Sequence, residues 1–165
     1  MLRKIILAAM LAALILFVIP PTVAQPPASP LVGAWEFTLT PNSKLPPDPI
    51  IPGLITFNAE GNAIASVGGV SPGEEQSTTE VSVAHGIWQL SPAVGRFFVR
   101  LISFSTNPNG SFHARRTFTM TIALNASHDE FTGGYSYDVE DATGHALTTG
   151  SGAVKGHLIP HPLLP

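Results

Sequence analysis

The stretch FHARRTFTMTIAL, residues 112–124, gives the clearest indication of the fold. Apolar side chains alternate along it with polar ones, most of which are threonines. The apolar set consists of Phe112, Ala114, Phe118, Met120, Ile122 and Leu124. A period of two places the two sets on opposite faces of a β-strand. The stretch therefore predicts a long strand that is buried on one face.

Similar segments, separated by turn signals, lie on both sides of this strand. The other expected strands are Trp35–Thr40, Leu54–Asn58, Ala63–Val67, Thr79–Leu90, Arg96–Ser105, Phe131–Glu140 and His145–Ile159. Five of the seven connections are short and have the composition of hairpin turns. The chain has 16 prolines and 15 glycines, only 12% charged residues and no amphipathic helical pattern. We therefore expect an all-β fold.

Eight sequential antiparallel strands with one apolar face close naturally into an up-and-down β-barrel, because closure removes the exposed edges. Several expected strands are longer than the usual five or six residues, which also favours a barrel. A β-sandwich is the alternative. We expect a bend or bulge at Gly86, and two long connections, Pro41–Pro52 and Gly68–Ser77, at the barrel rims.

The first 24 residues have the composition of an export signal. Basic residues in Met1–Lys4 precede an uninterrupted apolar run of 15 residues, Ile5–Ile19. Thr22–Ala24 supplies small residues for cleavage before Gln25. The apolar run is shorter than the roughly 20 residues of a membrane-spanning helix. The pattern predicts a secreted or periplasmic protein, and the alternative is a retained N-terminal anchor with the domain outside the cytoplasm.

The expected organisation has four parts: a signal peptide over residues 1–24, a proline-rich spacer over 25–30, a barrel domain over 31–159 and an irregular tail over 160–165. Loss of Arg3 and Lys4 with the signal changes the formal charge from −3 to −5. This charge and the lack of a basic stripe argue against nucleic acid as a partner, and no polybasic segment suits a membrane surface after cleavage. The chain contains no cysteine, which excludes disulfides and thiolate metal sites.

A G-x-W triplet, Gly33-Ala34-Trp35, opens the first expected strand. A triplet of this kind between an export signal and a run of antiparallel hairpins resembles the lipocalins and the wider calycin group, eight-stranded barrels that bind small apolar molecules. The resemblance implies that Gly33 and Trp35 belong to the closed end of the barrel and that a basic residue of the last strand, Lys155, packs over the indole. The glycine-rich stretch Gly150–Gly152 is also similar to barrels of the allene oxide cyclase and dirigent type.

Arg116 interrupts the apolar face of residues 112–124. If that face points into a barrel, the guanidinium lies among apolar side chains, where it needs a carboxylate partner or a ligand anion. Two alternatives place it elsewhere: near a rim with its charge in solvent, or outside the barrel because of a bulge between Arg115 and Arg116.

Aromatic residues complete the expected ligand site. Tyr135 and Tyr137 share a face with Phe131 and offer hydroxyl groups inside an apolar space, as binding pockets do. Phe118 and Trp88 are the other expected ligand contacts, and the alternative for all four is core filling. Three small residues expected to face inward favour an internal space: Ala114, Gly133 and Ala153.

The function expected from these features is that of an exported barrel that binds or carries a small hydrophobic ligand. One alternative is a cyclase or isomerase in which Arg116, Tyr135 or Tyr137 steers a reactive substrate, and another is a structural or adhesive surface domain without a ligand. We assign no catalytic residue, because the chain lacks a G-x-S-x-G motif. The six histidines have no metal-binding spacing, and no cofactor is expected.

Overall fold

The computed structural model describes residues 29–42, 50–68, 80–92 and 94–160. The expected signal peptide, most of the spacer, most of the tail and the central parts of the two long connections lie outside these residues.

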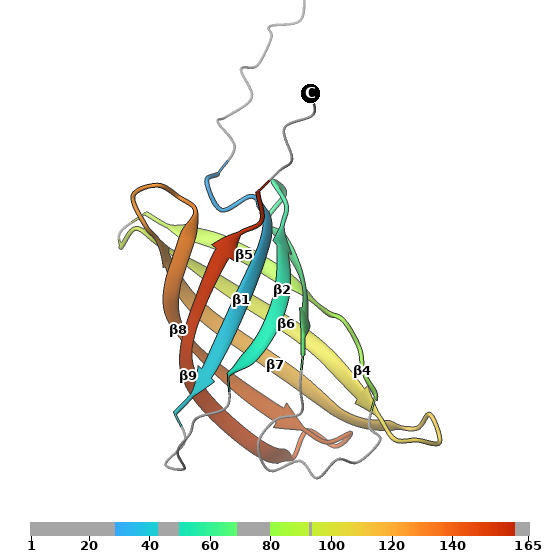
Figure 1. The fold of residues 1–165 in the computed structure, drawn as a ribbon. Helices are drawn as coiled ribbons and strands as arrows, with labels where there is room; N and C mark the ends of the chain where they lie inside the picture. Colours follow the sequence, from blue (N-terminus) through green and yellow to red (C-terminus); the bar gives the residue numbers. More distant parts are fainter. Residues whose placement is uncertain (1–28, 43–49, 69–79, 93, 161–165) are drawn as a thin grey trace, which may run out of the picture.

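Nine strands form a single antiparallel sheet that closes on itself (Figure 1). They are β1 (Gly33–Pro41), β2 (Ile51–Phe57), β3 (Asn62–Val67), β4 (Glu80–Val81), β5 (Ala84–Ser91), β6 (Arg96–Thr106), β7 (Phe112–Leu124), β8 (Glu130–Glu140) and β9 (Ala146–Leu158). Consecutive strands pair from β1 to β3 and from β5 to β9, and β3 pairs with β5. The β9–β1 pairing and the long β6–β7 ladder complete the ring. Because β4 and β5 both pair with β6 and act as one interrupted strand, the fold is an eight-stranded up-and-down barrel. This confirms the predicted fold class and rules out an open sandwich.

The strand is interrupted between β4 and β5, and not at Gly86, where the sequence predicted a bend or bulge. Ser82 and Val83 separate the two segments, and β5 runs without a break through Gly86. Gly86 serves another purpose, because a Cβ atom there would lie 1.8 Å from the backbone oxygen of Arg100 on β6. A glycine at this position permits a close approach of two backbones.

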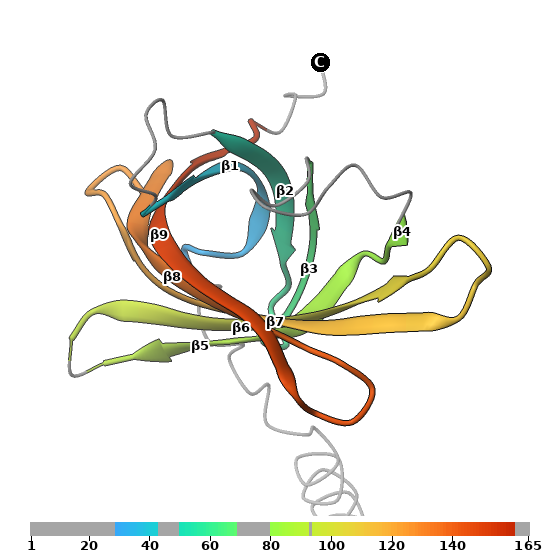
Figure 2. The ribbon, with the colours of Figure 1, turned by 90° about the horizontal axis from the view of Figure 1, so that it is seen from below.

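The barrel has two ends with different contents. We call the end at which β1 begins the tryptophan end and the opposite end the arginine end. Both ends of the described chain, near Ser29 and Pro160, lie at the tryptophan end (Figure 1). Seen along the barrel, the strands curl around the interior, and the segment that leads into β1 lies within this ring (Figure 2).

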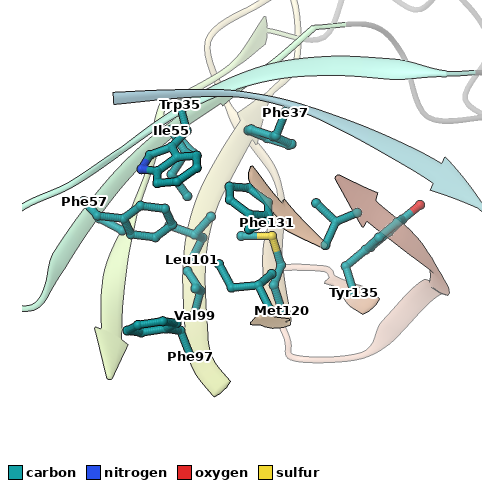
Figure 3. Packing of buried hydrophobic residues seen from close by; sticks show 14 of the residues in the cluster. Trp35, Phe37, Ile55, Phe57, Phe97, Val99, Leu101, Met120, Phe131 and Tyr135 are labelled. Atoms are coloured by element: carbon teal, nitrogen blue, oxygen red, sulfur yellow. The ribbon is translucent and has the colours of Figure 1, made fainter. Parts of the chain in front are cut away.

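A hydrophobic core fills the tryptophan end and the middle of the barrel. Side chains alternate along each strand, so that one set faces inward and is buried. Trp35, Phe57 and Phe131 are each at most 1% exposed, and Figure 3 shows Trp35 and Phe131 within one cluster with Val99, Leu101 and Met120. The rings of Trp35 and Phe131 are in contact, with centroids 5.2 Å apart.

Leu31 closes the tryptophan end together with Trp35. Both side chains are fully buried, and the indole nitrogen of Trp35 donates a hydrogen bond to the Leu31 carbonyl at 3.0 Å. Gly33 lies between them with a φ of 150°, and a Cβ there would lie 3.0 Å from the Leu158 side chain. The triplet Gly33-Ala34-Trp35 thus belongs to the closed end of the barrel.

Lys155 does not have the position that the lipocalin resemblance implied. It lies on the outer face of β9 with His157, opposite to the inward face that carries Val154 and Gly156. Its ammonium group is 3.5 Å from a carboxylate oxygen of Glu130, and its side chain is 52% exposed. The barrel wall therefore separates Lys155 from the indole of Trp35.

Two other side chains face outward where the sequence suggested inward. The register of the β6–β7 ladder shifts between Ser105 and Thr106, so Phe112 is 43% exposed and contacts the exposed Phe104. Ala153 is exposed on β9, whose inward positions include Gly150, Gly152 and Gly156. Glycines on the buried face remove the apolar signal that normally marks it, which explains the error for Ala153.

Candidate ligand cavity at the arginine end

A small, partly enclosed cavity lies inside the barrel at the arginine end. The centre of a water molecule can occupy about 50 Å³ of it. Apolar and polar groups contribute about equally to its wall. The lining residues are Leu39, Pro41, Ile51, Ala65, Val67, Ser82, Ala84, Ser103, Arg116, Phe118, Tyr135 and Tyr137.

Arg116 points into the barrel from β7. The β6–β7 and β7–β8 ladders keep their register through this residue, so there is no bulge between Arg115 and Arg116. Arg116 is only 7% exposed and lines the cavity, whereas Arg115 lies on the outer face, 3.9 Å from Glu140. Of the positions that the sequence left open, Arg116 therefore has the one inside the barrel.

A guanidinium is always charged and carries five N–H donors in a fixed plane. Arg116 and the hydroxyl groups of Ser103, Tyr135 and Tyr137 therefore bring several hydrogen-bond donors to this end of the interior.

Tyr135, Tyr137 and Phe118 lie close together on one side of the cavity. Phe118 on β7 faces Tyr137 across the ladder, with ring centroids 5.7 Å apart. Figure 3 shows Tyr135 at the edge of the hydrophobic cluster, with its oxygen pointing away from the other labelled side chains. Burial raises the pKa of Tyr135 above its usual value, and the nearby Tyr137 adds to this effect. Tyr135 therefore keeps its proton at neutral pH and is available as a hydrogen-bond donor.

Trp88, the remaining expected ligand contact, is not part of the cavity. It lies on β5 toward the tryptophan end and packs against Phe57 and Phe97. Its indole nitrogen donates to the carbonyl of Asn58 at 3.0 Å. Four of the five expected ligand contacts thus meet at one site, and Trp88 supports the opposite end of the core.

Ser103 is a cavity residue that the sequence reasoning missed. It lies directly opposite Arg116 in the β6–β7 ladder and is 3% exposed. Ser105, the next inward residue of β6, is fully buried, and its hydroxyl donates to the Ala114 carbonyl at 3.4 Å. The signal was present in the alternation of β6, where Phe97, Val99 and Leu101 are followed by serines at the same inward positions.

The described residues set limits on the chemistry of the chain. They contain no group of three or more His, Cys, Asp or Glu side chains that could hold a metal ion. No helix among them is long and apolar enough to cross a membrane.

Comparisons with known proteins add no family assignment: no protein-family model, no curated protein and no solved structure matches this chain.

Proposed function

We propose that this chain is an exported β-barrel protein that binds a small, mostly apolar molecule in the cavity at the arginine end. The observation that carries the proposal is the convergence of Arg116, Ser103, Tyr135 and Tyr137 in a partly enclosed space that apolar side chains also line. Apolar walls with a few convergent polar groups are the usual composition of a small-molecule site. The export pattern of residues 1–24 supports a secreted or periplasmic location.

The size of the cavity limits the ligand. The 50 Å³ open to the centre of a water molecule is smaller than the cavity of about 150 Å³ that can hold benzene. The cavity is only partly enclosed, so a ligand can extend beyond it. We therefore infer a small ligand of which the cavity encloses only a part.

The polar lining limits the ligand's chemistry. The guanidinium of Arg116 can only donate hydrogen bonds, and hydroxyl groups can donate as well as accept them. A ligand with a carbonyl, hydroxyl or carboxylate oxygen would meet donors at this end of the cavity. An aliphatic molecule without such a group would form no hydrogen bond with these donors.

Native mass spectrometry of the protein secreted by its own source tests this proposal. We expect a retained small molecule in the wild type and in Arg115→Ala, and its loss in Arg116→Ala. Arg115 is the matched control because it is the neighbouring arginine on the outer face of the same strand. If the wild type retains nothing and gains no thermal stability from a library of small aromatic and alicyclic compounds, the binding proposal is wrong and a structural role replaces it.

The export part of the proposal has a separate test. N-terminal sequencing of the secreted protein should begin at Gln25, and an intact Met1 would contradict cleavage.

A further inference from the structure

Two tyrosine rings form part of one wall of the cavity, and each lies against a glycine of the neighbouring strand. Tyr137 pairs with Gly150, and Tyr135 pairs with Gly152, across the β8–β9 ladder. A Cβ atom at Gly150 would lie 2.4 Å from Tyr137 Cε1, and one at Gly152 would lie 2.7 Å from Tyr135 Cε1. A Cβ atom at Gly152 would also lie 2.1 Å from the Thr40 backbone oxygen on β1. The Tyr137 ring therefore fills the side-chain space at Gly150, while the Tyr135 ring and the backbone of β1 share it at Gly152.

The two rings lie side by side along the strand. Their planes differ by only 15°, and their centroids are 6.5 Å apart. Two residues of a strand advance by about 6.6 Å, so the separation matches the strand repeat. We call Tyr135 and Tyr137 together the tyrosine platform. Both residues line the cavity.

The same arrangement occurs a third time on β8, at the closed end of the barrel. Phe131 pairs with Gly156, where a Cβ atom would lie 2.3 Å from the Phe131 ring. Here the indole of Trp35 packs on Phe131, at 5.2 Å between centroids. A ring held against a β9 glycine thus packs on another aromatic ring at both ends, Phe131 on Trp35 and Tyr137 on Phe118, and the tyrosine platform in addition borders the cavity.

We propose that the tyrosine platform selects a planar, conjugated ring system, which packs on Tyr135 and Tyr137 as Trp35 packs on Phe131. This inference rests on the proposed function, because it requires that the cavity binds a small molecule. Aromatic rings attract one another in offset or tilted arrangements beyond what the burial of area provides. Gly150 and Gly152 are specificity-determining residues in this proposal, because they hold the platform against the wall and keep the space in front of it free.

A matched pair of ligands tests the proposal by NMR titration of the full exported chain. Naphthol and decahydronaphthol share one fused carbon skeleton and one hydroxyl group, but only naphthol is planar and aromatic. We expect naphthol to bind about two- to tenfold more tightly. Its ring protons should also shift upfield, as they do when they lie over another aromatic ring.

A glycine variant connects this preference to the platform. Gly150→Ala places a methyl group where the Tyr137 ring lies, so the ring must leave the wall. Naphthol and decahydronaphthol should then bind with about equal affinity. Gly134→Ala is the control, since a Cβ there makes only an ordinary 3.7 Å contact with the Gly152 oxygen. If Gly150→Ala fails to fold, Tyr137→Leu removes the ring while keeping an apolar side chain, and the same loss of preference is expected.

The outcomes separate the two proposals. If decahydronaphthol binds as tightly as naphthol, or if the preference survives in both Gly150→Ala and Tyr137→Leu, the platform inference is wrong and the binding function stands. If neither ligand nor any other small molecule binds, both proposals are overturned.

Discussion

The two tryptophans provide a sharp test of how the barrel is closed. Each indole nitrogen donates to a backbone carbonyl at 3.0 Å, Trp35 to Leu31 and Trp88 to Asn58. The environments differ, because the first hydrogen bond is buried and the second is exposed to solvent. Substitution by phenylalanine makes the same chemical change at both sites, so the difference in cost measures the effect of burial.

The expected cost for Trp35→Phe has two parts. The smaller ring leaves part of a fully buried volume empty, which costs about 1–2 kcal/mol. The Leu31 carbonyl also loses its donor in a buried position, at a cost of about 1–3 kcal/mol. The total is about 2–5 kcal/mol, a large part of the stability of a typical domain. For Trp88→Phe, water replaces the lost donor and the residue is only partly buried, so we expect about 1 kcal/mol.

Urea denaturation followed by far-ultraviolet circular dichroism measures both costs, and it does not depend on which tryptophan remains. With a denaturant slope of about 2 kcal/mol per molar, Trp35→Phe should lower the midpoint by about 1–2.5 M and Trp88→Phe by about 0.5 M. Equal shifts, or a larger shift for Trp88→Phe, would refute the conclusion that Leu31 and Trp35 close the barrel.

Two further predictions concern backbone packing and pH. Gly86→Ala should lower the free energy of unfolding by about 3 kcal/mol or more, because its Cβ would collide with the Arg100 carbonyl. The control Gly134→Ala should change the free energy of unfolding by less than about 1 kcal/mol. Similar melting temperatures for the two variants would contradict this prediction. Because the pKa of Tyr135 is raised above 10.0 in the folded protein, its contribution to stability is present below pH 10 and is lost as pH rises through the folded pKa. Tyr135→Phe should remove this part of the alkaline destabilisation, and identical pH profiles of melting temperature for wild type and variant would show that the tyrosine is not responsible.

The alternation within single strands was enough to predict most of the barrel. The pattern of β7 placed Ala114, Arg116 and Met120 on the inward face, and the structure has them there. The same logic brought Arg116, Phe118, Tyr135 and Tyr137 to one interior without any knowledge of the cavity. Period-two patterns succeed here because each inward side chain occupies its own volume in the core.

The errors come from contacts between strands, which a single strand does not reveal. On β9 the inward positions carry Gly150, Gly152 and Gly156, because rings from β8, and at Gly152 also the backbone of β1, fill the space of the missing side chains. The alternation on β9 was therefore misread, and Ala153 was placed on the wrong face. The prediction for Lys155 was wrong for a related reason. Its place in the order of the chain suggested that it packs over Trp35, but the pairing of β9 with β1 and β8 decides which face of the sheet carries its side chain. Phe112 depended on a shift in register that the sequence does not signal.

The distribution of polar groups along the barrel indicates which end has a function beyond stability. Inward residues of β6 change from Phe97, Val99 and Leu101 to Ser103 and Ser105, and Arg116 faces Ser103 from the next strand. Buried hydroxyl groups and a buried guanidinium stabilise a core less than well-packed apolar side chains of the same volume would. A core optimised for stability alone would be apolar at both ends, as it is around Trp35. Departures from good packing are expected at functional sites. Here the buried polar residues gather at the arginine end, where the cavity lies, so their distribution and the cavity point to the same candidate site.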